Sequence, residues 1–135
     1  NDDGTNERKL FEIESGSIRP MYSPSGRMIS YYSNKKGGII INADGSNKRH
    51  FPGVIDDWSP DEKMVVAEYV GNEICVTNID GTNFRTIAEG SSPAWYYGEK
   101  IVFEWNKEGK GLFYLALIDA NTGKITSLIQ RGGGT

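Results

Sequence analysis

Residues 55–63 read Ile55-Asp56-Asp57-Trp58-Ser59-Pro60-Asp61-Glu62-Lys63, and this stretch decides the fold because the chain contains two further versions of it. The related stretches are Arg-Pro-Met-Tyr-Ser-Pro-Ser-Gly-Arg at 19–27 and Ser-Pro-Ala-Trp-Tyr-Tyr-Gly-Glu-Lys at 92–100. Their aromatic anchors, Tyr22, Trp58 and Trp95, stand 36 and 37 residues apart. Self-similarity at such a period indicates a repeat architecture in which each repeat is one supersecondary unit.

Each aromatic anchor is followed by the same series of short apolar runs and turns. The first runs are 28–32, 64–69 and 101–105, and the second runs are 39–41, 74–76 and 112–117. Asx- and Gly-containing turns follow at 42–47, 78–83 and 119–123, and a last short strand ends at Phe51, Ile87 and Leu128. Asp-Gly supplies the positive φ of a tight hairpin, and no segment of ten or more residues has helical apolar spacing. We therefore predict an all-β chain of three four-stranded antiparallel β-propeller blades, at about 17–52, 53–88 and 89–130.

The second repeat resembles the TolB-like β-propeller repeat, a relative of the WD repeats. The residues that carry the resemblance are Trp58-Ser59-Pro60-Asp61 and Asp80-Gly81-Thr82-Asn83. Departures from the family pattern are Tyr22 for Trp, Glu62 for Gly, and Tyr96-Tyr97-Gly98 for Ser-Pro-Asp, so we expect a different first turn in the third repeat. The resemblance implies that the first strand of each blade lines a central channel and that the aromatic anchors pack between blades.

Three blades are too few to close a ring, since propellers have about 4 to 8. The chain is expected either to pair with a second copy, giving a six-bladed ring by two-fold symmetry, or to form part of a longer propeller. Residues 3–10 repeat the turn and fourth-strand pattern of 44–51, which predicts an extra leading outer strand at about 5–12. We treat 1–131 as one three-bladed unit and 132–135, Gly-Gly-Gly-Thr, as a flexible tail.

Composition excludes several function classes. The net charge is −3 and the longest cationic cluster is Lys48-Arg49-His50, so no nucleic-acid partner is expected. No apolar run approaches the roughly 18 residues of a membrane span, so no membrane insertion is expected. One cysteine excludes an intrachain disulfide and a thiolate zinc site.

The residue types of catalytic and metal sites are also sparse. The only His50 and the only Cys75 fall in different repeats, and no Gly-x-Ser-x-Gly nucleophile motif is present. Segments 42–47 and 78–83 alternate Asx residues as calcium loops do, but their Gly is misplaced and the bidentate Glu is missing. We therefore predict no catalytic residue, no metal site and no cofactor.

Candidate ligand-binding residues are Arg19, Asp56, Asp57 and Ser92, which lie on the predicted inner strands close to the anchors. The adjacent carboxylates of Asp56 and Asp57 suit a cation or a basic ligand at the channel mouth. The alternative is a solvated strand start. Arg19 and Ser92 lie at the equivalent rim of the other two repeats, and propellers commonly bind their ligands there.

The sequence favours a non-catalytic binding or scaffolding propeller that completes its ring with a second copy and engages a protein or peptide. The resemblance implies protein–protein contacts and an extracytoplasmic, periplasmic or secreted setting. The alternative is the propeller part of a larger enzyme, such as a prolyl-oligopeptidase-type serine peptidase, in which similar repeats filter substrate.

Overall fold

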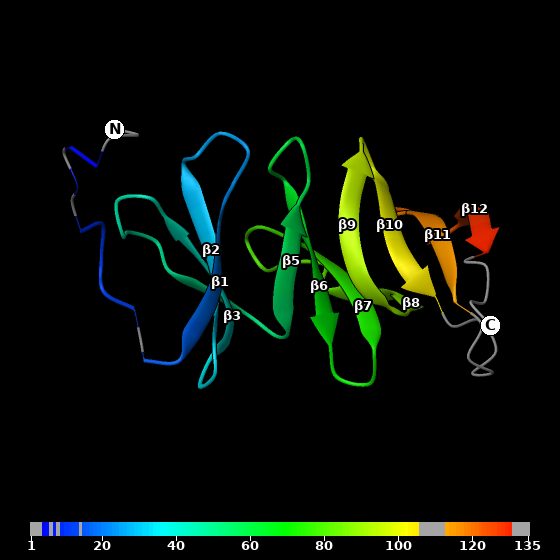
Figure 1. The fold of residues 1–135 in the computed structure, drawn as a ribbon, viewed down its shortest axis with the longest axis horizontal. Coiled ribbons are helices and arrows are strands. Elements are labelled where there is room, and N and C mark those ends of the chain that lie inside the picture. The colour runs from blue at the N-terminus through cyan, green and yellow to red at the C-terminus, as the bar shows by residue number, and fades with distance from the viewer. Residues whose placement is uncertain (1–3, 6, 8, 14, 106–112, 131–135) are drawn as a thin grey trace.

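The computed structural model describes residues 4, 5, 7, 9–13, 15–105 and 113–130, and these form three four-stranded antiparallel sheets with no helix. The strands are β1(Ser17–Tyr22), β2(Met28–Ser33), β3(Gly37–Asn42), β4(Arg49–Phe51), β5(Val54–Trp58), β6(Met64–Tyr69), β7(Glu73–Asn78), β8(Arg85–Glu89), β9(Ser91–Tyr97), β10(Lys100–Trp105), β11(Tyr114–Asp119) and β12(Ile125–Gln130). The sheets stand side by side in chain order (Figure 1). The predicted all-β fold of three four-stranded antiparallel units is confirmed.

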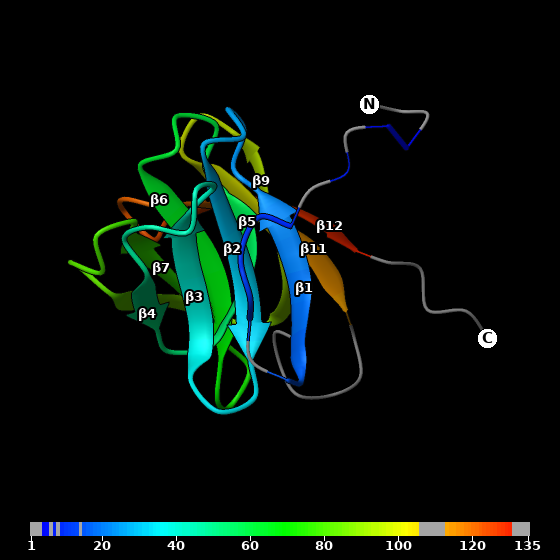
Figure 2. The same cartoon turned by 90° about the vertical axis from the view of Figure 1, so that its left-hand side faces the viewer.

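Each sheet, which we call blades 1, 2 and 3, is a meander whose strands pair in chain order. The first and fourth strands therefore lie at opposite edges, as Figure 2 shows for β1 and β4. The Asx turns join the third strand to the fourth. The Asp44 and Asp80 carboxylates accept the Ser46 and Thr82 N–H groups at 2.9 Å in both cases. These bonds, with those from the Ser46 and Thr82 hydroxyls, lower the pKa of both aspartates.

The first turn of the third blade differs from the other two, as expected. In blades 1 and 2 the hydroxyl of Ser23 or Ser59 accepts the N–H of Met28 or Met64, at 3.1 and 3.0 Å. In blade 3, β9 runs on to Tyr97 and β10 begins at Lys100, so two residues make the turn. Gly98 of that turn has φ +52°, a conformation that glycine adopts without a Cβ clash.

We call the face of a blade that meets the preceding blade its head face and the opposite face its tail face. Trp58 on the head face of blade 2 is 3% exposed, and its indole N–H donates to Ser30 Oγ on blade 1 at 3.0 Å. It packs with Ile40 and Phe51 from blade 1 and with Ile55 and Val65 from blade 2. The expected packing of the anchor between blades is confirmed here.

The interface between blades 2 and 3 repeats this arrangement with a more extensive cluster of buried apolar residues. Val66, Ile74 and Val76 of the blade 2 tail face pack against the blade 3 head face, formed by Ile101, Phe103, Ala116 and Ile118. Trp95 packs on this cluster and is half-buried. Its indole N–H donates to the Gly98 carbonyl at 2.6 Å, because blade 2 carries Val66 where blade 1 carries Ser30. The anchors of blades 2 and 3 therefore each pack against the preceding blade.

The head face of blade 1 carries the N-terminal segment, residues 9–13, where both views place it (Figures 1 and 2). A Cβ added to Gly45 would lie 3.4 Å from Phe11 Cβ, and one added to Gly81 would lie 3.9 Å from Phe51 Cε1. Gly45 and Gly81 are equivalent turn residues. Phe11 thus occupies, against blade 1, the place that the fourth-strand residue Phe51 occupies against blade 2.

The extra leading strand expected at about 5–12 is not formed, since none of the described residues between 4 and 13 belongs to a strand. The segment repeats the packing of an outer strand without the ladder, because no third strand of a preceding blade lies beside it in this structure. The expected tail, 132–135, lies outside the described residues. Within the described part of the chain, no helix has the length and apolarity needed to cross a membrane.

The anchor of blade 1 does not pack between blades, contrary to expectation. Tyr22 is 58% exposed, because no blade stands before blade 1 in this chain. At the other end of the row, Leu115 on the blade 3 tail face is 39% exposed. The row of blades therefore ends in two partly uncovered apolar faces.

Candidate functional site

The four predicted site residues lie on the first strands of the three blades, near an irregularity in each. The register between the first and second strands shifts between Ile18 and Met21 in blade 1 and between Ile55 and Asp57 in blade 2. In blade 3 it shifts between Ser91, which pairs with Glu104, and Ala94, which pairs with Val102. Such bulges redirect backbone and side-chain groups out of the ladder. Arg19 and Ser92 have φ values of +59° and +52°, which places both in the left-handed region.

Arg19 and Asp56 form an ion pair between blades 1 and 2. Arg19 Nη2 lies 3.1 Å from Asp56 Oδ1. The Arg19 side chain is 52% exposed, whereas that of Asp56 is 5% exposed. The aspartate is therefore a buried partner of an accessible guanidinium.

Asp57 bridges blades 2 and 3 through its two carboxylate oxygens. Oδ1 accepts the N–H of Trp58 at 2.8 Å, and Oδ2 accepts the N–H of Trp95 at 2.7 Å. Both donors are backbone groups of anchor residues. The carboxylate therefore fixes the distance between two successive inner strands.

Glu68 of β6 completes this set, and the sequence interpretation did not include it. Its Oε1 accepts the N–H of Ser92 at 2.7 Å, which joins blade 2 to blade 3. The sequence feature that could have identified Glu68 is its position in the repeat, because Glu68 and Glu104 stand 36 residues apart at the same place in the second strand.

Asp56 lies close to the Glu68 carboxylate and has a raised pKa. Burial, followed by the nearby Glu68 carboxylate, raises the pKa of Asp56 to about 7, and Arg19 offsets part of the effect. Asp56 Oδ2 is buried and accepts no hydrogen bond. Protonation turns it into a donor toward Glu68, which satisfies both carboxyl groups. Asp56 is thus poised to change charge near neutral pH.

All four predicted residues therefore belong to one network across the inner strands, which we call the inner network: Arg19, Asp56, Asp57, Glu68, Ser92 and Trp95. Its two aspartates face other protein groups. Arg19 and Ser92 are exposed. The binding of a ligand by these residues stays a prediction, and Arg19 is the charged member that an incoming molecule can reach.

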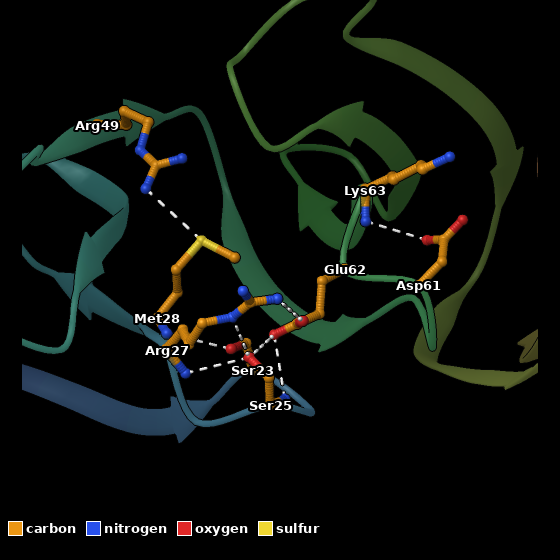
Figure 3. A network of polar contacts seen from close by, with 8 residues as sticks. All are labelled: Ser23, Ser25, Arg27, Met28, Arg49, Asp61, Glu62 and Lys63. Carbon is orange, nitrogen blue, oxygen red and sulfur yellow. Dashed lines mark hydrogen bonds and ion pairs between the residues drawn. The ribbon is translucent and has the colours of Figure 1, made fainter.

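A second polar network joins the first turns of blades 1 and 2 (Figure 3). The Glu62 carboxylate accepts Ser25 N–H at 3.1 Å and Ser25 Oγ at 2.6 Å, and lies 3.6 Å from Arg27 Nη2. Hydrogen bonds from Ser23 and Ser25 lower the pKa of Glu62 to about 2. Glu62 has φ +59°, so its backbone adopts the conformation of the glycine that it replaces in the family pattern. The Glu62 side chain therefore binds the first turn of the preceding blade, and we call this set of contacts the clasp.

The structure places the remaining reactive groups apart. His50 is exposed on β4 of blade 1, whereas Cys75 is buried on β7 of blade 2 beside Thr86, with Sγ 3.5 Å from Oγ1. Burial raises the pKa of the Cys75 thiol, which disfavours the nucleophilic thiolate. Among the described residues, no three His, Cys, Asp or Glu side chains are grouped so that they could hold a metal ion.

Solved structures of β-propellers resemble this chain in fold. The β-propeller domain of the Trilobed protease from Pyrococcus furiosus, described as having an open velcro topology, superposes with a TM-score of 0.68 at 14% identity, over 85% of this chain and 42% of that one. TolB from Acinetobacter baumannii gives 0.61 at 18% identity, over 82% of this chain and 31% of that one.

The acylaminoacyl peptidase of Pyrococcus horikoshii gives a TM-score of 0.67 at 10% identity, over 85% of this chain and 24% of that one. The chain thus spans less than half the length of each of these proteins. No family model matches the sequence, and no curated protein matches it. At these identities the likeness shows a β-propeller fold and no more, which is the fold that the repeats predicted.

Proposed function

We propose that this chain is a non-catalytic binding or scaffolding propeller module and that two copies join to form a six-bladed ring. The observation that carries the proposal is that the apolar residues on the two uncovered end faces stand at the same positions as those that pack together at the two internal interfaces. Tyr22 stands on the head face of blade 1 where Trp58 and Trp95 stand on the other head faces. Leu115 and Leu117 stand on the tail face of blade 3 where Ile74 and Val76 stand on that of blade 2.

The same interface can therefore form again between copies. The tail face of blade 3 meets the head face of blade 1 of the other copy, and two-fold symmetry produces two such contacts. An open groove of about 460 Å³ on the head face, lined mainly by Leu10, Ile13, Pro20, Tyr22 and Tyr31, receives the docking blade. Closure buries apolar surface that a soluble monomer seldom exposes.

The head face is already partly filled by Phe11. Because Phe11 occupies a fourth-strand position, the docking blade packs chiefly through its inner three strands, β9 to β11. The Tyr22 side of the face stays open for these strands. The N-terminal segment then supplies the outer part of the contact.

The binding role rests on the inner network. In a closed ring, Arg19 and Ser92 of each copy present exposed polar groups on the inner strands, where a protein or peptide ligand would make contact. An extracytoplasmic setting is part of the proposal through the motif resemblance to TolB-like repeats. His50 is exposed on β4 whereas Cys75 is buried on β7 of another blade, an arrangement that favours binding over catalysis.

Sedimentation equilibrium of the purified chain tests the proposal. A single species with twice the mass of the chain, independent of concentration in the micromolar range, is expected. A folded monomer at all concentrations contradicts ring closure by a second copy, and a ladder of larger species contradicts a closed ring.

The alternative is a propeller that forms part of a larger enzyme, as a substrate filter of a serine peptidase. It is favoured by the likeness to acylaminoacyl peptidase, of whose chain the present one covers 24%. It predicts that the chain stays monomeric or aggregates by itself, whereas addition of further blades in the same polypeptide restores a monodisperse monomer.

A further inference from the structure

The starting point is the contact between Ser92 and Glu68 across the interface of blades 2 and 3. Ser92 N–H donates to Glu68 Oε1 at 2.7 Å. The donor sits in the bulge of β9 with φ +52°, and this conformation turns the N–H out of its own sheet toward the preceding blade. The residue that follows is Pro93, which has no N–H. Ser92 is therefore the donor that this bulge offers.

Arg19 has the same local structure on blade 1. It lies in the bulge of β1, has φ +59° and precedes Pro20. A non-glycine residue in this region is strained and persists where its surroundings hold it. In blade 2 the equivalent residue is Ile55, which is β-branched and does not adopt a positive φ. The donor geometry is therefore a feature of blades 1 and 3 alone.

Glu104 takes on blade 3 the place of Glu68 on blade 2. Glu68 pairs with Val54 of the first strand and Ile74 of the third. Glu104 pairs with Ser91 of the first strand and Leu115 of the third, which are the equivalent residues. Phe103 points to the head face, so the next residue, Glu104, points to the tail face.

We propose that in the closed ring the Glu104 carboxylate of one copy accepts the backbone N–H of Arg19 of the other copy. The contact repeats the one between Glu68 and Ser92 at the ring-closing interface. This inference rests on the proposed two-copy ring and specifies which groups recognise each other in it.

The contact extends the polar contacts between blades to the ring-closing interface. Within one chain, the Arg19 guanidinium binds Asp56, Asp56 lies close to Glu68, and Glu68 accepts the N–H of Ser92. With Glu104 on the N–H of Arg19, the ring-closing interface gains the same carboxylate-to-backbone contact that joins blades 2 and 3. Arg19 then has two partners: its backbone N–H binds Glu104 of the other copy, and its side chain binds Asp56 of its own copy.

The test compares Glu104→Ala with Glu68→Ala. A hydrogen bond to a charged group contributes enough to change an equilibrium about 10-fold or more, and the ring contains two copies of the contact. We expect Glu104→Ala to raise the dimer dissociation constant on the order of 100-fold, measured by sedimentation, with Glu104→Gln between it and the wild type. Glu104 also interacts within its own chain, so urea unfolding of the dilute monomer is measured for both variants, and the loss of dimer affinity is judged beyond the loss of monomer stability.

The amide resonances supply a readout specific to the contact. In ¹H–¹⁵N spectra the Arg19 N–H should move downfield when the dimer forms, and Glu104→Ala should abolish that shift while leaving the Ser92 N–H in place. A dimer that forms equally well with Glu104→Ala, with no shift at Arg19, overturns the inference and leaves the proposed ring intact. The absence of any dimer in the wild type overturns the ring itself.

Discussion

Asp57 and Trp95, 38 residues apart, are joined across two blades by one hydrogen bond of 2.7 Å from the Trp95 N–H to Asp57 Oδ2. The other oxygen of the same carboxylate holds the N–H of Trp58. One side chain therefore sets the spacing of both anchors. A propeller whose blades are held mainly by apolar contacts gains directional contacts at its inner edge in this way.

Substitution of Asp57 should separate this contribution from the apolar packing. Asp57→Ala leaves two backbone N–H groups without their charged acceptor and is expected to lower the free energy of unfolding by about 3 kcal/mol. Asp57→Asn keeps one acceptor oxygen and should lose less. Urea denaturation followed by tryptophan fluorescence measures both, and an Ala variant as stable as the wild type contradicts this role.

The blades were predictable from sequence because local signals agree in each repeat. The Asp-Gly turns and Ser-Pro stops of the first two repeats, together with the short apolar runs of all three, place the strands without knowledge of their neighbours. The packing of Trp58 between blades was implied by the resemblance of its repeat to the TolB-like pattern, whereas the equivalent Tyr22 is 58% exposed.

The contacts between repeats were not predictable in the same way. Glu68 binds Ser92 only because the β9 bulge turns the Ser92 N–H toward blade 2, and the bulge is a backbone feature that no residue type specifies. The N-terminal segment shows the same limit. Its sequence repeats a fourth strand, but a strand needs a partner, so only the packing of Phe11 is reproduced.

The raised pKa of Asp56 predicts a stability that depends on pH between about 4 and 7. The group has a pKa of about 7 when folded against a reference of 3.8, so the folded state binds more protons in this range. The free energy of unfolding should therefore fall as pH rises from about 4 to 7, by up to about 4 kcal/mol from this group, and level off above it.

Asp56→Asn should remove this dependence, because the amide stays neutral and can still donate to Glu68. The measurement is a series of urea denaturations at pH 4.5 to 8 on both proteins. The difference between them should grow in favour of the Asn variant as pH rises. Parallel pH profiles for the two proteins would show that Asp56 titrates normally.

Glu62 should show the opposite pH dependence, at lower pH. Its pKa is lowered to about 2 by the hydroxyls of Ser23 and Ser25, so its contribution is present above about 4.5 and is lost as pH falls toward 2. We expect Glu62→Gln to unfold with a weaker pH dependence than the wild type in this acidic window. Thermal unfolding at pH 2 to 5 measures the effect, and identical profiles contradict the clasp.

The backbone of Glu62 gives a separate prediction. Because φ is +59°, Glu62→Ala loses the clasp and keeps the strained conformation, whereas Glu62→Gly loses the clasp and relieves the strain. The Gly variant should therefore be more stable than the Ala variant by about 1 kcal/mol. The reverse order, measured by urea denaturation, would mean that the turn relaxes to a negative φ.

Tyr22 distinguishes a ring from a row of blades, because it is 58% exposed in the single chain whereas its counterpart Trp58 is 3% exposed. If blade 3 of a second copy covers it, Tyr22→Ala removes an aromatic anchor from each of the two ring-closing contacts. Anchor residues at interfaces commonly contribute about 2 kcal/mol or more, so the dimer dissociation constant should rise by at least about 100-fold. Tyr22→Trp, which restores the residue found in the other two blades, should tighten the dimer.

Val70→Ala is the matched control and should leave the dissociation constant unchanged. Val70 is 70% exposed in the turn between β6 and β7, away from both ends of the row of blades. Sedimentation equilibrium across the four proteins reads out the order, and equal behaviour of Tyr22→Ala and Val70→Ala would show that the head face of blade 1 does not take part in self-association.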